Sequence, residues 1–113
     1  SEDWGALDAA FLRLPDFQLR LEELAVLQER GPGDATAAAF AERLLELYYG
    51  DLRAHELRHR AALAEGDDTH AALHAAAGEA IATAIEATGD GSPERPWRVL
   101  SAAQAYAWLE TRR

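Results

Sequence analysis

Residues 51–85 read DLRAHELRHRAALAEGDDTHAALHAAAGEAIATAI, and this stretch decides the fold expected for the whole chain. It consists of two alanine-rich segments with apolar residues at helical spacing, separated by EGDD at 65–68. Apolar residues that recur every three or four positions indicate amphipathic helices, and a Gly-Asp turn between them indicates a reversal of the chain. The stretch therefore predicts a helical hairpin.

The same helical spacing extends to both sides of the hairpin, and clear breaks separate the segments. GPGD at 31–34 contains a capping glycine, a helix-blocking proline and an N-capping aspartate, and GDGSPERP at 89–96 is the loosest linker. No segment combines β-branched residues with alternation, so no strand is expected. We predict a single all-α domain over 1–113, a compact antiparallel helical bundle of about four to five helices without a sheet. The helices are expected at about 2–14, 15–30, 35–65, 69–88 and 96–111, and Gly50 leaves open a break within 35–65.

Composition excludes several classes of function. The chain has no cysteine and no lysine, which excludes disulfides, thiolate metal sites, Schiff-base catalysis and a Walker-type phosphate site. Its net charge of −9 argues against binding to nucleic acid or to an anionic membrane, because both depend on attraction to phosphate. No apolar run reaches membrane-spanning length, and no leader opens the sequence, so the cytoplasm is the expected location.

All four histidines lie in the hairpin, as two pairs spaced i, i+4: His55 with His59, and His70 with His74. On a helical wheel both pairs fall on the apolar faces of their helices. If the hairpin folds about the middle of EGDD, His59 faces His74, with His55 and His70 on either side. The expected result is one cluster of four imidazoles at the interface of two helices.

Four buried imidazoles need partners for both of their ring nitrogens, and a divalent metal ion supplies them. We therefore expect His55, His59, His70 and His74 to bind zinc, iron, copper or nickel, with haem as an alternative cofactor. Asp51 and Glu56, at the edge of the cluster, are then expected to support the metal ligands. Tyr48 lies on the same apolar face as His55 and His59 and can hydrogen-bond to a cofactor. The alternative is that the histidines lie at the rim of the bundle and bond to carboxylates or water.

Two short motifs carry partial resemblances to known families. His55-Glu56-Leu57-Arg58-His59 resembles the HExxH motif of zinc peptidases, which implies Glu56 as the general base. His74 followed by Gly78 resembles the histidine phosphotransfer domains, which implies a phosphate-accepting His74. The basic residue that precedes the glycine in that family is Ala77 here.

The sequence thus supports a metal- or cofactor-binding helical bundle as the first hypothesis for the function. The alternative is a non-catalytic protein-interaction module, such as an adaptor, an immunity factor or an accessory subunit, with a protein partner or as a homodimer. Whether the protein is an enzyme is left open.

Overall fold

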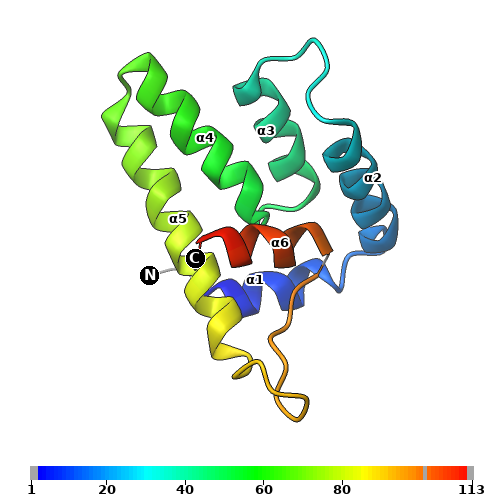
Figure 1. Cartoon of the computed structure of the whole chain (residues 1–113). Coiled ribbons are helices and arrows are strands. Elements are labelled where there is room, and N and C mark those ends of the chain that lie inside the picture. Colours follow the sequence, from blue (N-terminus) through cyan, green and yellow to red (C-terminus); the bar gives the residue numbers. More distant parts are fainter. Residues whose placement is uncertain (1–2, 101, 112–113) are drawn as a thin grey trace.

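The computed structural model describes residues 3–100 and 102–111, which contain six α-helices and no strand (Figure 1). The prediction of an all-α fold is confirmed, but the arrangement only roughly resembles an antiparallel bundle of four or five helices. The helices are α1 (Trp4–Phe11), α2 (Phe17–Arg30), α3 (Ala37–Leu47), α4 (Leu52–Glu65), α5 (Asp68–Ala87) and α6 (Ala102–Thr111).

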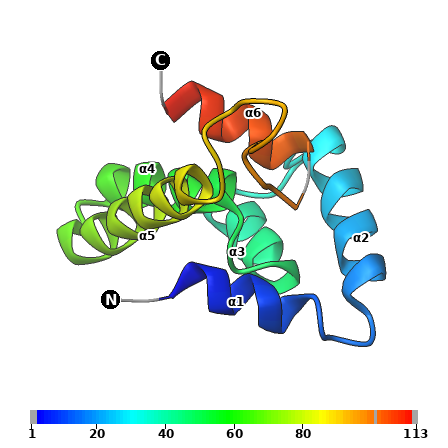
Figure 2. The same ribbon diagram turned by 90° about the horizontal axis from the view of Figure 1, so that it is seen from below.

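The helices α4 and α5 form a long antiparallel hairpin, and α3 packs beside α4. Figure 2 shows α1 and α6 on opposite sides of the layer formed by α3, α4 and α5, with α2 at its edge. Two groups of buried side chains hold these layers together. The first joins α1, α5, α6 and the start of α4 through Trp4, Leu52, Ile81, Ala82, Ile85, Ala107 and Trp108. The second joins α1, α2, α3 and the start of α4 through Phe11, Leu24, Ala41, Leu44, Leu47, Tyr48 and Ala54.

The turn of the hairpin follows from its glycine and aspartate. Gly66 ends α4 in a left-handed conformation with φ 74°, which favours glycine, and its N–H bonds to carbonyls of the last turn. Asp67 caps α5 by accepting the His70 N–H at 3.1 Å. The helical hairpin was therefore predicted correctly, although its second helix begins one residue earlier than expected.

The break that Gly50 left open within 35–65 is present, because the chain leaves the helix at Tyr48 and re-enters it at Leu52. Tyr48 is extended, and a Cβ on Gly50 would lie 2.6 Å from the Tyr48 hydroxyl, so the path of the chain requires glycine there. Asp51 then caps α4 by accepting the Ala54 N–H at 3.0 Å. The break is closed by Gln104 of α6, which accepts the Leu52 N–H at 2.8 Å and donates to the Gly50 carbonyl at 3.0 Å.

The last helix was also predicted to begin too early, since α6 begins at Ala102 rather than at residue 96. The Arg98 N–H instead donates to the Thr88 hydroxyl at 2.7 Å, which ties the linker back to the end of α5. Trp97 lies against Trp108, with ring centroids 4.5 Å apart. These contacts outside the helix take the place of the first turn predicted for it. Residues 2 and 101 of the predicted helices lie outside the described residues.

Candidate functional site: the histidines and two adjoining pockets

The structure separates the four histidines that the sequence placed in one cluster. His55 is fully buried at 0% exposure and His74 is 8% exposed, and their Nδ1 atoms lie 3.1 Å apart. His59, half-buried one turn along α4, bonds through Nδ1 to the Ala71 carbonyl at 2.8 Å. His70 is exposed and its Nδ1 pairs with Asp67 at 2.6 Å. The partner expected for His74 was His59, but the ring that bonds to it is His55.

The hydrogen bonds determine which nitrogen of each buried ring carries the proton. The Nε2 of His55 lies 2.8 Å from the Tyr49 carbonyl, which can only accept, so Nε2 is the donor. Burial lowers the pKa of His55, and burial followed by nearby positive charge lowers the pKa of His74, which favours two neutral rings. The Nδ1 of neutral His55 is therefore an acceptor, and His74 donates to it through its own Nδ1–H. In this arrangement the two Nδ1 atoms are hydrogen-bonded to each other.

Aromatic side chains enclose the His55 ring. Trp4 and Tyr49 stack on each other at 5.9 Å, and each presents its ring nearly perpendicular to the His55 imidazole, at 6.0 and 5.1 Å. Both nitrogens of His55 are thus occupied by protein groups, and its faces are covered. In a zinc peptidase both histidines of HExxH turn a lone pair to one metal ion, whereas here His55 turns away from His59 to Tyr49 and His74. His74, the residue that the phosphotransfer resemblance marks, is 8% exposed and its Nδ1 is hydrogen-bonded to His55.

A small pocket of about 160 Å³ lies between α4 and α5, beside His59 and His74. Its walls combine two histidines and two glutamates with small residues; they are Leu52, Glu56, His59, His74, Ala75, Gly78 and Glu79. Glu56 is half-buried, lies 3.7 Å from the Arg53 guanidinium, and has its pKa raised mainly by burial. Within residues 3–100 and 102–111, no three histidine, aspartate or glutamate side chains are arranged to hold a metal ion.

The other two predicted site residues serve the break between α3 and α4. Asp51 is 1% exposed, accepts the Gln28 amide at 2.9 Å, and has its pKa raised to about 6 by burial. The Tyr48 hydroxyl donates to Asp8 at 2.6 Å, and burial, followed by this carboxylate, raises the pKa of Tyr48. Neither side chain bonds to a histidine in the structure.

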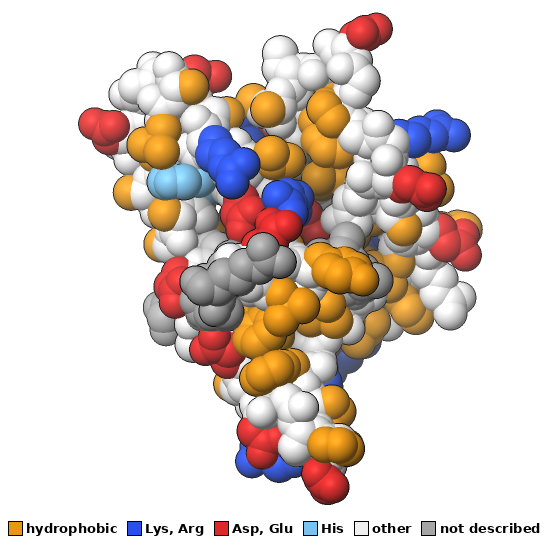
Figure 3. Space-filling model, viewed as in Figure 1, with side chains coloured by type: hydrophobic (Ala, Val, Ile, Leu, Met, Phe, Trp, Pro, Cys, Tyr) orange, Lys and Arg blue, Asp and Glu red, His pale blue; other side chains and the backbone are white. Residues whose placement is uncertain are grey.

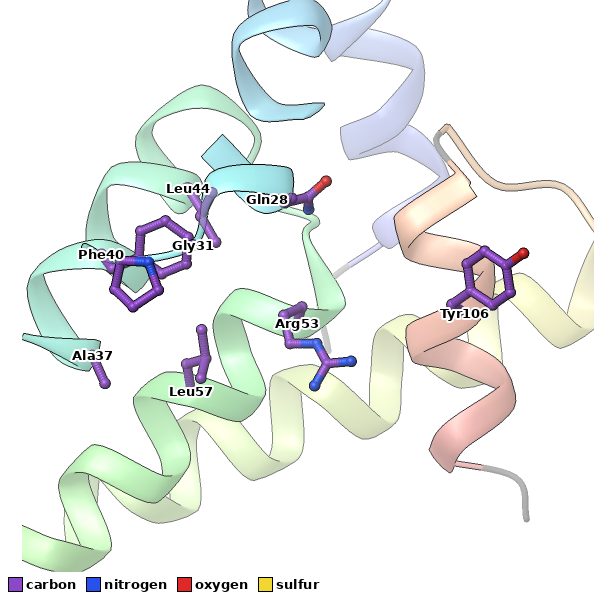
Figure 4. A pocket seen from close by; sticks show the side chains of 9 residues that line it. Gln28, Gly31, Ala37, Phe40, Leu44, Arg53, Leu57 and Tyr106 are labelled. Carbon is purple, nitrogen blue, oxygen red and sulfur yellow. The ribbon is translucent and has the colours of Figure 1, made fainter. Parts of the chain in front are cut away.

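A groove of about 460 Å³ among the described residues was not anticipated from the sequence. In Figure 4, Phe40 and Leu44 of α3 lie across from Leu57 of α4, with Arg53 and Tyr106 toward one end. The complete lining is Gln28, Gly31, Pro32, Ala37, Phe40, Leu44, Arg53, Leu57 and Tyr106. The signal available in the sequence was Gln28, a polar residue beside the apolar stripe of its helix. Its Oε1 is buried and has no hydrogen-bond partner.

The comparisons with known proteins give no relative of this chain: no protein-family model, no curated protein and no solved structure matches it. No helix among the described residues is both long and apolar enough to span a lipid bilayer.

Proposed function

We propose that this protein is a non-catalytic interaction module that binds an amphipathic helix of a partner protein in the groove between α2, α3 and α4. The observation that carries the proposal is the groove itself, an apolar hollow that stays open although three helices converge on it. Figure 3 shows hydrophobic side chains gathered in the hollow between the α4–α5 hairpin and the α2 and α3 helices. An apolar groove lined by helices suits the apolar face of another helix, with anchor residues spaced three or four apart.

Aromatic and polar groups at the end of the groove support a protein as the ligand. Tyr106 is 68% exposed there, and exposed tyrosines are frequent among the residues that contribute most to protein–protein binding. Gln28 at the same end donates its amide to Asp51 at 2.9 Å, so this end of the groove has a polar wall. A ligand with polar groups beside its apolar side chains suits such a wall.

Charge indicates the chemistry of the partner. Arg53, the one cation among the described residues of the groove wall, bonds to Glu110 at 2.9 Å and lies 3.7 Å from Glu56, so its charge is more than balanced by these two carboxylates. The whole chain carries −9. Such a surface attracts basic partners and repels acidic ones. The proposed ligand is a helix with apolar anchors and arginine or lysine residues at the side that faces α6.

Site-specific photo-crosslinking in the cells that naturally make this protein tests the proposal. Ala37 is exposed and lines the groove, whereas Ala39 is exposed on the same helix but does not line it. A benzophenone amino acid at position 37 should yield one protein adduct, attached to a basic amphipathic helix, and the same group at 39 should not. Equal labelling at both positions, no adduct at 37, or an adduct with a second copy of this chain would each contradict the proposal.

A blocking variant supplies the quantitative arm of the test. Ala37→Trp fills the groove from an exposed position without altering the core, and Ala39→Trp is the matched control. Binding of the crosslinked partner's helical peptide should weaken at least tenfold in the first variant and stay unchanged in the second. Circular dichroism verifies that both variants keep their helical content. An unaltered affinity in Ala37→Trp would show that the peptide binds outside the groove and would contradict the proposal.

A further inference from the structure

The small pocket between α4 and α5 is lined by His59 and His74, and hydrogen bonds outside the pocket assign the tautomer of each ring. His59 donates its Nδ1–H to the Ala71 carbonyl at 2.8 Å, because a carbonyl oxygen can only accept. In this tautomer the lone pair of the ring is on Nε2. This tautomer is held by the backbone of α5, so it does not depend on any ligand in the pocket.

The second lone pair follows from the buried pair of histidines. His55 gives its Nε2–H to the Tyr49 carbonyl and accepts through Nδ1, which obliges His74 to donate from its own Nδ1. The Nε2 of His74 is therefore also a lone-pair nitrogen. Both rings line the same pocket of about 160 Å³, and they come from facing helices. Ala75 and Gly78 in the wall of that pocket have little or no side chain to fill it.

This arrangement is the one that protein metal sites use to orient a histidine ligand. A ligating imidazole generally donates its other ring N–H to a carbonyl, a carboxylate or a water molecule, which holds the ring in position and sets the tautomer. The Ala71 carbonyl does this for His59, and the Nδ1 of His55 does it for His74. Glu56 also lines the pocket, and its carboxylate is a further oxygen ligand for a divalent cation.

We propose that the Nε2 atoms of His59 and His74 chelate a divalent transition-metal ion, with Glu56 and water completing its coordination. Imidazole ligands suit zinc, copper and nickel. The proposal assigns different roles to the four histidines: His59 and His74 are ligands, His55 positions His74, and His70 is outside the site. Because no three such side chains in the described ranges are already arranged around one point, the site requires the Glu56 carboxylate to turn toward the ion.

Calorimetric titration of the tag-free protein with zinc chloride, and separately with nickel chloride, tests the proposal. We expect binding of one ion per chain, weakened at least tenfold by His59→Gln and unchanged by His70→Ala. The control is demanding, because His70 and His74 are spaced i, i+4 on α5 and form the alternative chelating pair on the surface. If His70→Ala weakens binding as strongly as His59→Gln, or if no ion binds, the proposal is wrong.

Three further measurements distinguish a loss of metal binding from a loss of folding. His59→Gln is chosen because this ring is only half-buried, and its circular dichroism spectrum should match that of the wild type. Zinc should raise the melting temperature of the wild type, since the ion joins α4 to α5, and should leave that of His59→Gln unchanged. In nitrogen NMR spectra, zinc should shift the Nε2 resonances of His59 and His74. A shift confined to His70 and His74 would identify the surface pair and overturn the proposal.

Discussion

The buried aspartate at the start of α4 makes stability depend on pH in an unusual direction. N-capping aspartates generally have a lowered pKa, because a helix N-terminus favours negative charge. Asp51 accepts the expected Ala54 N–H, but it is 1% exposed, and burial raises its pKa from 3.8 to about 6. The folded protein therefore holds a proton on Asp51 at pH values where the unfolded chain has lost it.

The sign and size of the effect follow from this difference. Because the pKa of Asp51 is higher in the folded state, its stabilising contribution is complete below about pH 3.8 and is lost as the pH rises through about 6. At about 1.4 kcal/mol per pH unit, the loss amounts to roughly 3 kcal/mol. Asp51→Asn cannot ionise and so should not show this loss. Its side-chain oxygen still accepts the Ala54 N–H, and its amide can donate to Gln28 once the Gln28 amide has turned over.

Urea unfolding of wild type and Asp51→Asn between pH 4 and pH 7.5, followed by tryptophan fluorescence, measures the difference. The variant should gain stability relative to the wild type as the pH rises, by roughly 3 kcal/mol across the range. The matched control is Asp67→Asn, which alters the N-cap of α5 at an exposed position. Hydrogen bonds from the backbone and side chain of His70 lower the pKa of Asp67 below 3.8, so its ionisation changes stability only below this pH range, and the control curve should run nearly parallel to that of the wild type. Parallel curves for wild type and Asp51→Asn would refute the reasoning.

Three substitutions around the break between α3 and α4 give further predictions, all measured by urea unfolding. Tyr48→Phe removes the 2.6 Å bond to the half-buried Asp8 and should cost about 1–2 kcal/mol; an unchanged midpoint would show that Asp8 finds another donor. Gly50→Ala forces its Cβ against the Tyr48 hydroxyl and should cost about 1–3 kcal/mol, so a neutral result would mean that the loop relaxes freely. Gln104→Leu leaves the Leu52 N–H and the Gly50 carbonyl without their partner and should cost about 2 kcal/mol or more. Amide exchange at Leu52 should accelerate in that variant; an unchanged exchange rate would contradict the role of Gln104.

The features that the sequence predicted correctly depend on neighbouring residues. The apolar spacing determined the helical class, and EGDD located the reversal between α4 and α5. Gly31, expected to cap its helix, does so with φ 75°. Such signals are local, because a glycine or an aspartate acts on backbone groups a few residues away.

The features that were missed depend on contacts between distant segments. The break after α3 is completed by Gln104, more than fifty residues away, and Trp97 lies against Trp108 where a continuous helix was expected. A helical wheel places a residue on a face but does not determine how far two helices slide past each other. His74 accordingly meets His55, one turn from the predicted partner His59. The four rings therefore do not converge on one point, and His59 and His74 are the two that line a common pocket.

The bonds of Gln104 have a consequence for the order in which the helices come together. The contacts of the α4–α5 hairpin are close in sequence, so this hairpin can form before α6 docks. The joint between α3 and α4 cannot be completed at that time, because the Leu52 N–H and the Gly50 carbonyl wait for a side chain from α6. A chain in which α6 has not docked should therefore expose an open joint to chaperones and proteases. Docking of α6 is the step that completes this joint.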